Sequence, residues 1–135
     1  MVVGQSNNTA IIIQARISSN RLPSKIALDL CGKTVLERVI DQCKNAKNIA
    51  DLIIATSNET SDDITAEIGR RAGINVYRGS LLDVRSRYID AGKGYEYIVR
   101  VTADNPFTDP IYIYSSINDL IKNNYDYVSI SNCPY

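Results

Sequence analysis

The chain has 135 residues, which is the size of one domain and is enough to bury a hydrophobic core. Basic and acidic residues number 15 each, so the net charge is zero and no overall field would hold nucleic acid or an anionic membrane. Histidine is absent, which excludes histidine-based metal sites and the catalytic systems that pair histidine with serine or cysteine.

The beginning of the chain predicts a leader and a buried strand. Residues 1–10 are polar and lack the charged and apolar regions of a signal peptide, so we expect a disordered leader, with the domain running from residue 11 to residue 135. Residues 11–13 are a β-branched run that is typical of a strand buried on both faces. A long polar loop, residues 18–33, comes next.

A helix, a second strand and a second helix follow that loop. Thr34 and Glu37 have the spacing of a capping box, which predicts a helix that ends near residue 46. Residues 51–56 predict a second buried strand. Ser61 or Asp62 can cap the second helix. We expect this helix to end at glycine 73 and to bury Ile64, Ile68 and Ala72.

The second half of the chain repeats the alternation. Residues 75–78 predict a short strand, and the spacing of Ser80 and Asp83 predicts a capping box that opens a helix running to about residue 91. Residues 97–102 predict a fourth strand. A helix is then expected to begin at the pair Asp109-Pro110, with Ile113, Ile117, Leu120 and Ile121 on its inner face, and residues 127–130 can form a last strand.

Strands that alternate with helices predict an α/β fold: a mostly parallel sheet between two layers of helices. In such a sheet the loops after the strands carry the ligands, at the carboxyl edge. No stretch reaches the length of apolar residues that a membrane helix needs. The three cysteines, Cys31, Cys43 and Cys133, are scattered and form no CxxC motif, so we expect buried or incidental thiols in a reducing cytoplasm.

Three cations crowd the loop after the first strand: Arg16, Arg21 and Lys25. Like charges repel unless an anion lies between them, and a triphosphate fits both the bidentate fork of arginine and the point charge of lysine. The alternative is an ordinary solvated loop. Neither GxxxxGK[ST] nor GxGxxG is present, which disfavours a P-loop and a Rossmann dinucleotide site.

One carboxylate follows the fourth strand. Asp104 stands in the stretch VTADNP, where it could hold Mg²⁺ against phosphate oxygens. The alternative is an aspartate that caps the turn formed by Asn105-Pro106. Because the cations and Asp104 lie on loops at the same edge of the predicted sheet, together they favour a phosphate site more than either does alone.

Four stretches of the sequence carry a resemblance to a known family: QARISSNRLPSK, ADLIIATS, VYRGSLLDVRSRY and IVRVTADNPFTDP. In this order and at these intervals they resemble the cytidylyltransferases of the SpsF type, which are relatives of the CMP-Kdo and CMP-sialic acid synthetases. The resemblance extends from residue 11 to about residue 131. It implies a nucleotide-diphospho-sugar transferase fold, also called GT-A-like, of which this chain would be an incomplete copy.

The resemblance also implies residue roles. Arg16 and Lys25 would bind the triphosphate and, with Asp104 as the Mg²⁺ ligand, would carry catalysis; Arg78 would lie near the base or ribose and Thr102 at the base edge. The full set of nucleotide-binding residues implied is Gln14, Ala15, Arg16, Arg21, Lys25, Ser57, Arg78 and Thr102.

The activity implied is transfer of CMP from CTP to a sugar acid with release of pyrophosphate, in the cytoplasm, for the synthesis of a surface polysaccharide such as that of a spore coat. The implied partners are CTP and the sugar-acid acceptor, with Mg²⁺ as cofactor, and neither nucleic acid nor a membrane. A homodimer is left open. The tyrosines near the end of the chain suit an interface, although core positions explain most of them equally well.

The sequence departs from the family pattern in composition and in length. Ser18, Ser24 and Ala103 stand where relatives commonly have glycine. Family members also extend well beyond residue 135, so we expect this chain to lack a second metal-binding acid, much of the acceptor pocket and a dimer-forming arm. The alternative to an enzyme is therefore a nucleotide-binding module without turnover.

Overall fold

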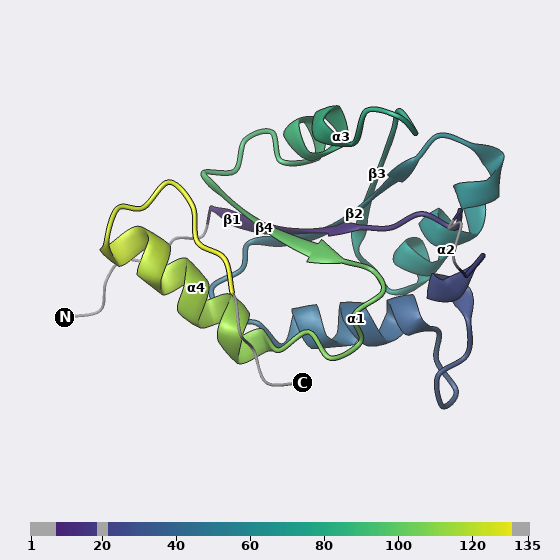
Figure 1. Ribbon diagram of the computed structural model, residues 1–135, viewed down its shortest axis with the longest axis horizontal. Helices are drawn as coiled ribbons and strands as arrows, with labels where there is room; N and C mark the ends of the chain where they lie inside the picture. The colour runs from purple at the N-terminus through teal and green to yellow at the C-terminus, as the bar shows by residue number, and fades with distance from the viewer. Residues whose placement is uncertain (1–7, 19–21, 131–135) are drawn as a thin grey trace.

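Four parallel strands form one sheet in the order β3-β2-β1-β4 in the computed structural model, which describes residues 8–18 and 22–130 (Figure 1). The strands are β1 (Thr9–Gln14), β2 (Asp51–Ser57), β3 (Asn75–Gly79) and β4 (Tyr97–Thr102). The α-helices are α1 (Val35–Lys44), α2 (Asp63–Arg71), α3 (Val84–Ala91) and α4 (Pro110–Lys122). Two short 3-10 helices, η1 (Lys25–Ala27) and η2 (Thr60–Asp62), lie in the loops after β1 and β2.

The helices cover both faces of the sheet, which confirms the predicted three-layer α/β architecture. In Figure 1, α3 lies above the strands whereas α1 and α4 lie below them. The larger core cluster joins the sheet to α1, α2 and α4, and the smaller one joins its opposite face to α3. None of the described helices combines the length and the apolar character that crossing a bilayer requires.

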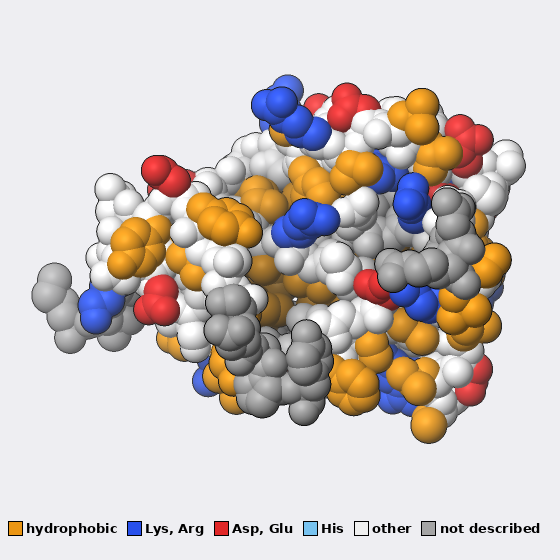
Figure 2. All heavy atoms as spheres, in the orientation of Figure 1, with side chains coloured by type: hydrophobic (Ala, Val, Ile, Leu, Met, Phe, Trp, Pro, Cys, Tyr) orange, Lys and Arg blue, Asp and Glu red, His pale blue; other side chains and the backbone are white. Residues whose placement is uncertain are grey.

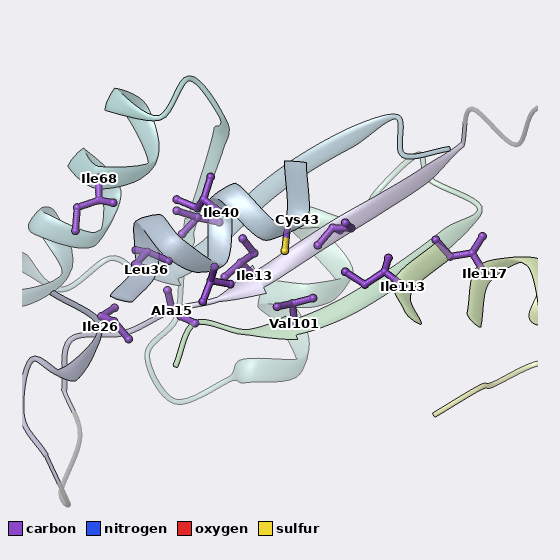
Figure 3. Packing of buried hydrophobic residues seen from close by; sticks show 14 residues of the cluster. Ile13, Ala15, Ile26, Leu36, Ile40, Cys43, Ile68, Val101, Ile113 and Ile117 are labelled. Carbon is purple, nitrogen blue, oxygen red and sulfur yellow. The ribbon is translucent and has the colours of Figure 1, made fainter. Parts of the chain in front are cut away.

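The β-branched run of β1 forms the centre of the core. Ile11, Ile12 and Ile13 are fully buried because the central strand is covered on both faces. Figure 3 shows Ile13 among the residues of the larger cluster, on one of these faces. Cys43 of α1 packs in the larger cluster, and burial raises the pKa of its thiol to about 12. Such a thiol is chemically inert, as the sequence predicted for a buried cysteine. Cys31 is exposed and also free, and Cys133 lies outside the described residues.

Two predicted helix starts are confirmed by their hydrogen bonds. The Thr34 hydroxyl accepts from the Glu37 N–H at 3.1 Å while the Glu37 carboxylate accepts from the Thr34 N–H at 2.6 Å, which completes the capping box of α1. At α4, the Asp109 carboxylate accepts from the Ile111 N–H at 2.8 Å, and Pro110 is the first helical residue.

Two boundaries near the start of elements were placed wrongly. β1 begins at Thr9, and Thr9 and Ala10 are fully buried, so both belong to the strand and not to a leader; residues 1–7 lie outside the described part of the chain. The predicted helix start at Ser80 is also wrong. Ser80 does accept from the Asp83 N–H, but α3 begins only at Val84, and Asp83 caps it by accepting from the Ser86 N–H.

Two predictions about side chains and strands are wrong for packing reasons. Ile64 is 49% exposed because the buried face of α2 is formed instead by Thr65, Ala66, Ile68 and Gly69. Residues 127–130 form no strand. Within the described part of the chain β4 is paired only with β1, and the segment after α4 has no ladder partner there, with Tyr127 78% exposed.

Ser24 has a left-handed backbone, with φ of 59°, at one of the positions where the resemblance implies glycine in relatives. A left-handed conformation costs an L residue with a side chain roughly 1–2 kcal/mol, while the greater chain entropy of glycine offsets about half of that. We therefore expect Ser24→Gly to raise the free energy of unfolding by up to about 1 kcal/mol, or the melting temperature by roughly 3 °C. Thermal unfolding followed by circular dichroism measures the change.

Ser18→Gly is the matched control for that prediction. Ser18 is exposed in the same loop, but it is not among the described non-glycine residues with positive φ. Glycine there relieves no strain and adds only chain entropy, so the melting temperature should stay the same or fall slightly. A rise as large as that of Ser24→Gly would show that the backbone conformation at Ser24 is not the cause.

Candidate active site at the carboxyl edge of the sheet

The site predicted from the sequence lies where the strand order reverses, between β1 and β4. Gln14, the last residue of β1, is paired in register with Thr102, the last residue of β4, and the Ala103 N–H donates to the Gln14 carbonyl at 3.1 Å. Arg16 and Asp104 each lie two residues beyond this pair, so both follow strands that end side by side at one edge.

The loop after β1 folds back on itself and brings its two ends together. The Ser24 N–H donates to the Ile17 carbonyl at 3.0 Å, so Arg16 and Lys25 flank the base of the loop. The Lys25 ammonium then donates to the Asp104 carboxylate at 2.6 Å, across 79 residues of sequence. Arg16 is exposed and makes no ion pair with any described residue.

The ion pair sets the ionisation of Asp104. The hydrogen bond from Lys25 holds the pKa of this carboxyl below its ordinary value of 3.8, against a smaller opposing effect of partial burial. A lowered folded-state pKa stabilises the fold above the unfolded-state pKa, and this stabilisation is lost as the pH falls through the lower, folded-state value. Because the side chains are 35% and 42% exposed, solvent screening keeps that contribution small.

Removing the lysine charge should therefore move the titration of Asp104. In Lys25→Met we expect the pKa of Asp104 to rise, because the favourable hydrogen bond is gone while the partial burial stays. Titration of the side-chain carboxyl carbon by NMR measures this. Lys33→Met is the control: Lys33 pairs with Asp41 at 2.5 Å, and its loss should leave the Asp104 titration unchanged. An unchanged Asp104 pKa in Lys25→Met would contradict the pairing.

Asp62 holds the start of the same loop, a role that the sequence did not reveal. Its side chain is 1% exposed and accepts from the Ile17 N–H at 2.6 Å and from the Ser57 hydroxyl. Of the two predicted cap residues, Ser61 and Asp62, it is Asp62 that occupies the N-cap position of α2, but its side chain makes no capping hydrogen bond. The partner is 45 residues away, so local spacing gave no signal for it.

Two of the predicted nucleotide-binding residues, Arg78 and Ser57, form hydrogen bonds within the protein. The guanidinium of Arg78 donates to the Ser57 carbonyl at 2.9 Å, to the Glu59 carbonyl at 2.7 Å and to the Asp63 carboxylate at 2.6 Å. Ser57 is fully buried, with its hydroxyl on Asp62. Both residues thus order the loop between β2 and α2 in this structure, and a contact of either with a nucleotide stays a prediction.

The remaining predicted residues lie at the same edge or outside the described part. Thr102 is exposed beside Gln14, whose side-chain oxygen accepts from the Tyr88 hydroxyl at 3.0 Å. Ala15 is buried in the core and its N–H donates to the Ala55 carbonyl, which leaves only its backbone carbonyl for a ligand. Arg21 lies outside the described residues.

Two surface hollows lie beside other residues, and the second of them reaches Ala27 of η1. One is at the amino ends of β2 and β3, where Asp51 and Asn75 line it, and the other lies between α1 and α2, where Glu37 and Arg71 line it. Neither is lined by Lys25 or Asp104. The charged groups that the loops bring together, and not the depth of a hollow, therefore mark the candidate site.

Comparison with known proteins decides the family. The family model described as Cytidylyltransferase matches residues 10–135. The chain belongs to the cytidylyltransferase family. Within this family, the spore coat polysaccharide biosynthesis protein SpsF of Bacillus subtilis is 33% identical over 134 residues, which are 95% of this chain and 56% of that protein. The resemblance inferred from four sequence motifs is thus confirmed.

Solved structures of the family confirm the fold. A cytidylyltransferase from Leptospira borgpetersenii aligns with a TM-score of 0.80 and 37% identity, over 86% of this chain and 50% of that one. The CMP:2-keto-3-deoxy-manno-octonic acid synthetase complexed with CTP aligns with a TM-score of 0.73 and 19% identity, over 86% of this chain and 48% of that one. This chain therefore spans about half the length of the relatives it matches.

Proposed function

We propose that this chain binds CTP at the carboxyl edge of its sheet and forms the nucleotide-binding part of an enzyme that transfers CMP to a sugar acid for surface polysaccharide synthesis. The observation that carries the proposal is the meeting of Lys25 and Asp104, 2.6 Å apart, between β1 and β4 in a chain of the cytidylyltransferase family. The names of SpsF and of the CTP-bound synthetase support the polysaccharide, the sugar acid and CTP.

The reaction exchanges one bond to phosphorus for another. A hydroxyl of the sugar acid attacks the α-phosphorus of CTP and loses its proton, while the bond from that phosphorus to pyrophosphate breaks. The protein contributes positioning and charge neutralisation, since the transfer requires little covalent chemistry from the protein itself. Arg16 and Lys25, which flank the base of one loop, would bind the triphosphate oxygens and stabilise the charge that develops on the leaving pyrophosphate.

The site fits Mg²⁺ that is carried mainly by the nucleotide. The described residues contain no cluster of three metal-ligating side chains, and at this edge they offer the Asp104 carboxylate. Mg²⁺ commonly keeps several waters and takes one or two carboxylates together with substrate phosphates, so a single aspartate is an adequate protein ligand. When bound there, the ion would neutralise phosphate charge and orient the α-phosphate.

A second candidate function is nucleotide binding without turnover. The observation that favours it is that the chain matches about half the length of its relatives, so the other half of each relative has no counterpart in the alignment. The two candidates share the nucleotide site and differ only in whether these 135 residues release pyrophosphate.

Thermal shifts with the four ribonucleoside triphosphates, with and without Mg²⁺, test the nucleotide site. We expect CTP with Mg²⁺ to stabilise the fold most; at one hundred times its dissociation constant a ligand contributes about 2.7 kcal/mol. A pyrophosphate-release assay with CTP and 2-keto-3-deoxy-manno-octonic acid then separates the two candidates. Release above the no-protein rate favours the enzyme, while binding without release favours the module. Equal shifts with all four nucleotides would contradict selectivity for CTP.

A further inference from the structure

Arg87 of α3 is a buried cation that the nucleotide site described above does not use. Its side chain is 1% exposed, and neither Nε nor either Nη atom has a hydrogen-bond partner among the described residues. A guanidinium has five N–H donors and no acceptor, and it does not give up its charge. Burying a charge without a partner costs free energy of folding, so this guanidinium is available to donate to an acceptor that the described protein does not provide.

The side chain lies at the same edge of the sheet as the candidate active site. Gly79, the last residue of β3, makes room for it: a Cβ there would be 3.0 Å from the Arg87 Cγ and 2.9 Å from the Tyr77 ring. Tyr88, the next residue of α3, donates its hydroxyl to Gln14 at the end of β1. Arg87 thus lies beside the carboxyl end of β3, and its neighbour Tyr88 reaches the carboxyl end of β1, on the face of the sheet that α3 covers.

No acid among the described residues accepts a hydrogen bond from the Arg87 guanidinium, and a second arginine lies against the neighbouring residue Tyr88. Arg100 of β4 lies 5.6 Å from the centroid of the Tyr88 ring. Burial raises the pKa of Tyr88, and the charges of Arg100 and Arg87 oppose this rise. The nearest acid along α3, Asp90, instead accepts from the Tyr77 hydroxyl at 2.9 Å. In Figure 2, several Lys and Arg side chains lie on the upper part of the visible face, on the side where α3 lies in Figure 1, with acidic side chains at the upper rim.

Arg78 shows what a structural arginine looks like in this fold. All three of its guanidinium nitrogens donate to acceptors of the protein, and they tie the loop after β2 in place. Arg87 is more deeply buried and yet makes none of these bonds. A structural arginine would be expected to satisfy its donors inside the protein, so the contrast points to a binding role for Arg87.

We propose that Arg87 binds an oxyanion of the reactants, either a phosphate group of the nucleotide or the carboxylate of the sugar acid, with Arg100 beside it. The inference rests on the proposed function for the identity of the reactants. Arginine suits both groups, because its planar fork matches the oxygens of phosphate and of carboxylate. On binding, the oxyanion would satisfy donors that have no protein acceptor, so part of the cost of burying the charge would be recovered only in the complex.

The test compares Arg87→Met with Arg85→Met, an exposed arginine on the same helix. Calorimetry and thermal shifts would use three probes at fixed salt: inorganic pyrophosphate, CTP with Mg²⁺, and 2-keto-3-deoxy-manno-octonic acid. We expect Arg87→Met to keep or raise the melting temperature without ligand, since methionine removes a buried unpaired charge. It should lower the affinity for at least one probe tenfold or more, while Arg85→Met leaves all three affinities unchanged.

The pattern over the probes identifies the oxyanion. Loss for pyrophosphate and CTP assigns Arg87 to a phosphate, and loss for the sugar acid alone assigns it to the carboxylate. Unchanged affinity for all three in Arg87→Met, or no binding of any probe by the unmodified chain, overturns the proposal. If Arg87→Met does not fold, Arg87→Lys takes its place and should weaken the same probe less. Equal binding of CTP and the other nucleotides would contradict the proposed function. The effect of Arg87→Met on pyrophosphate binding would still test the oxyanion site.

Discussion

Replacing Asp62 by alanine should cost the fold about 3 kcal/mol, or roughly 10 °C in melting temperature. The buried carboxylate accepts from the Ile17 N–H and from the Ser57 hydroxyl, and its removal leaves both donors without an acceptor in a site closed to solvent. Hydrogen bonds to a charged group are worth about 1.5–3 kcal/mol each, and an orphaned buried donor adds its own cost. Chemical denaturation followed by circular dichroism measures the loss.

The same change should weaken nucleotide binding, because Ile17 anchors the loop that carries Arg16 and Lys25. Asp63→Ala is the matched control: Asp63 is the next residue, but it is 64% exposed and pairs with Arg78 at the surface. A surface pair of this kind contributes at most about 1 kcal/mol. Asp62→Asn should fall between the two, since its amide keeps one acceptor. Similar losses for Asp62→Ala and Asp63→Ala would show that the buried carboxylate is not a special anchor.

The elements that the sequence predicted well are those whose signal is local. The capping box of Thr34 and the Asp109-Pro110 start are defined by contacts within three residues, and β4 has the predicted bounds. The misplaced start at Ser80 shows the limit of such signals. Its hydroxyl makes the predicted hydrogen bond, but the helix begins only after the exposed loop residue Leu82, since Asp83 offers a second cap.

The parts of the site that escaped prediction depend on contacts across the chain. Lys25 and Asp104 were assigned to the same edge from the strand pattern, but their direct ion pair required the return of the loop after β1. Asp62 was interpreted as a helix cap because the residue that it holds, Ile17, is far away in sequence. For Ser24, by contrast, the position where the resemblance implied glycine does have a left-handed backbone, which glycine adopts readily.

Removing Lys25 and removing Asp104, the two partners of the ion pair at the edge, should change the affinity for CTP in opposite directions when Mg²⁺ is absent. In the proposed site Lys25 leaves Asp104 for a phosphate oxygen when CTP binds. Lys25→Met removes one charge-assisted contact and should lower the affinity for CTP by about 10- to 100-fold, with or without Mg²⁺. Asp104→Asn should not lower the affinity for CTP in the absence of Mg²⁺. It frees Lys25 from a partly exposed ion pair, so binding tightens, by less than about fivefold.

With Mg²⁺ present, the effect of Asp104→Asn should change sign. The ion would have lost the carboxylate proposed to hold it, so the tightening that Mg²⁺ gives to the unmodified chain should shrink or disappear. Calorimetry of CTP with each variant, in Mg²⁺ and in a chelator, gives all four affinities. Lys33→Met and Asp41→Asn remove a pair of similar length and exposure away from the edge and should leave them unchanged. Equal weakening of CTP binding by Asp104→Asn in both conditions would contradict the metal role and the release of Lys25, because the contribution of a metal ligand depends on the metal.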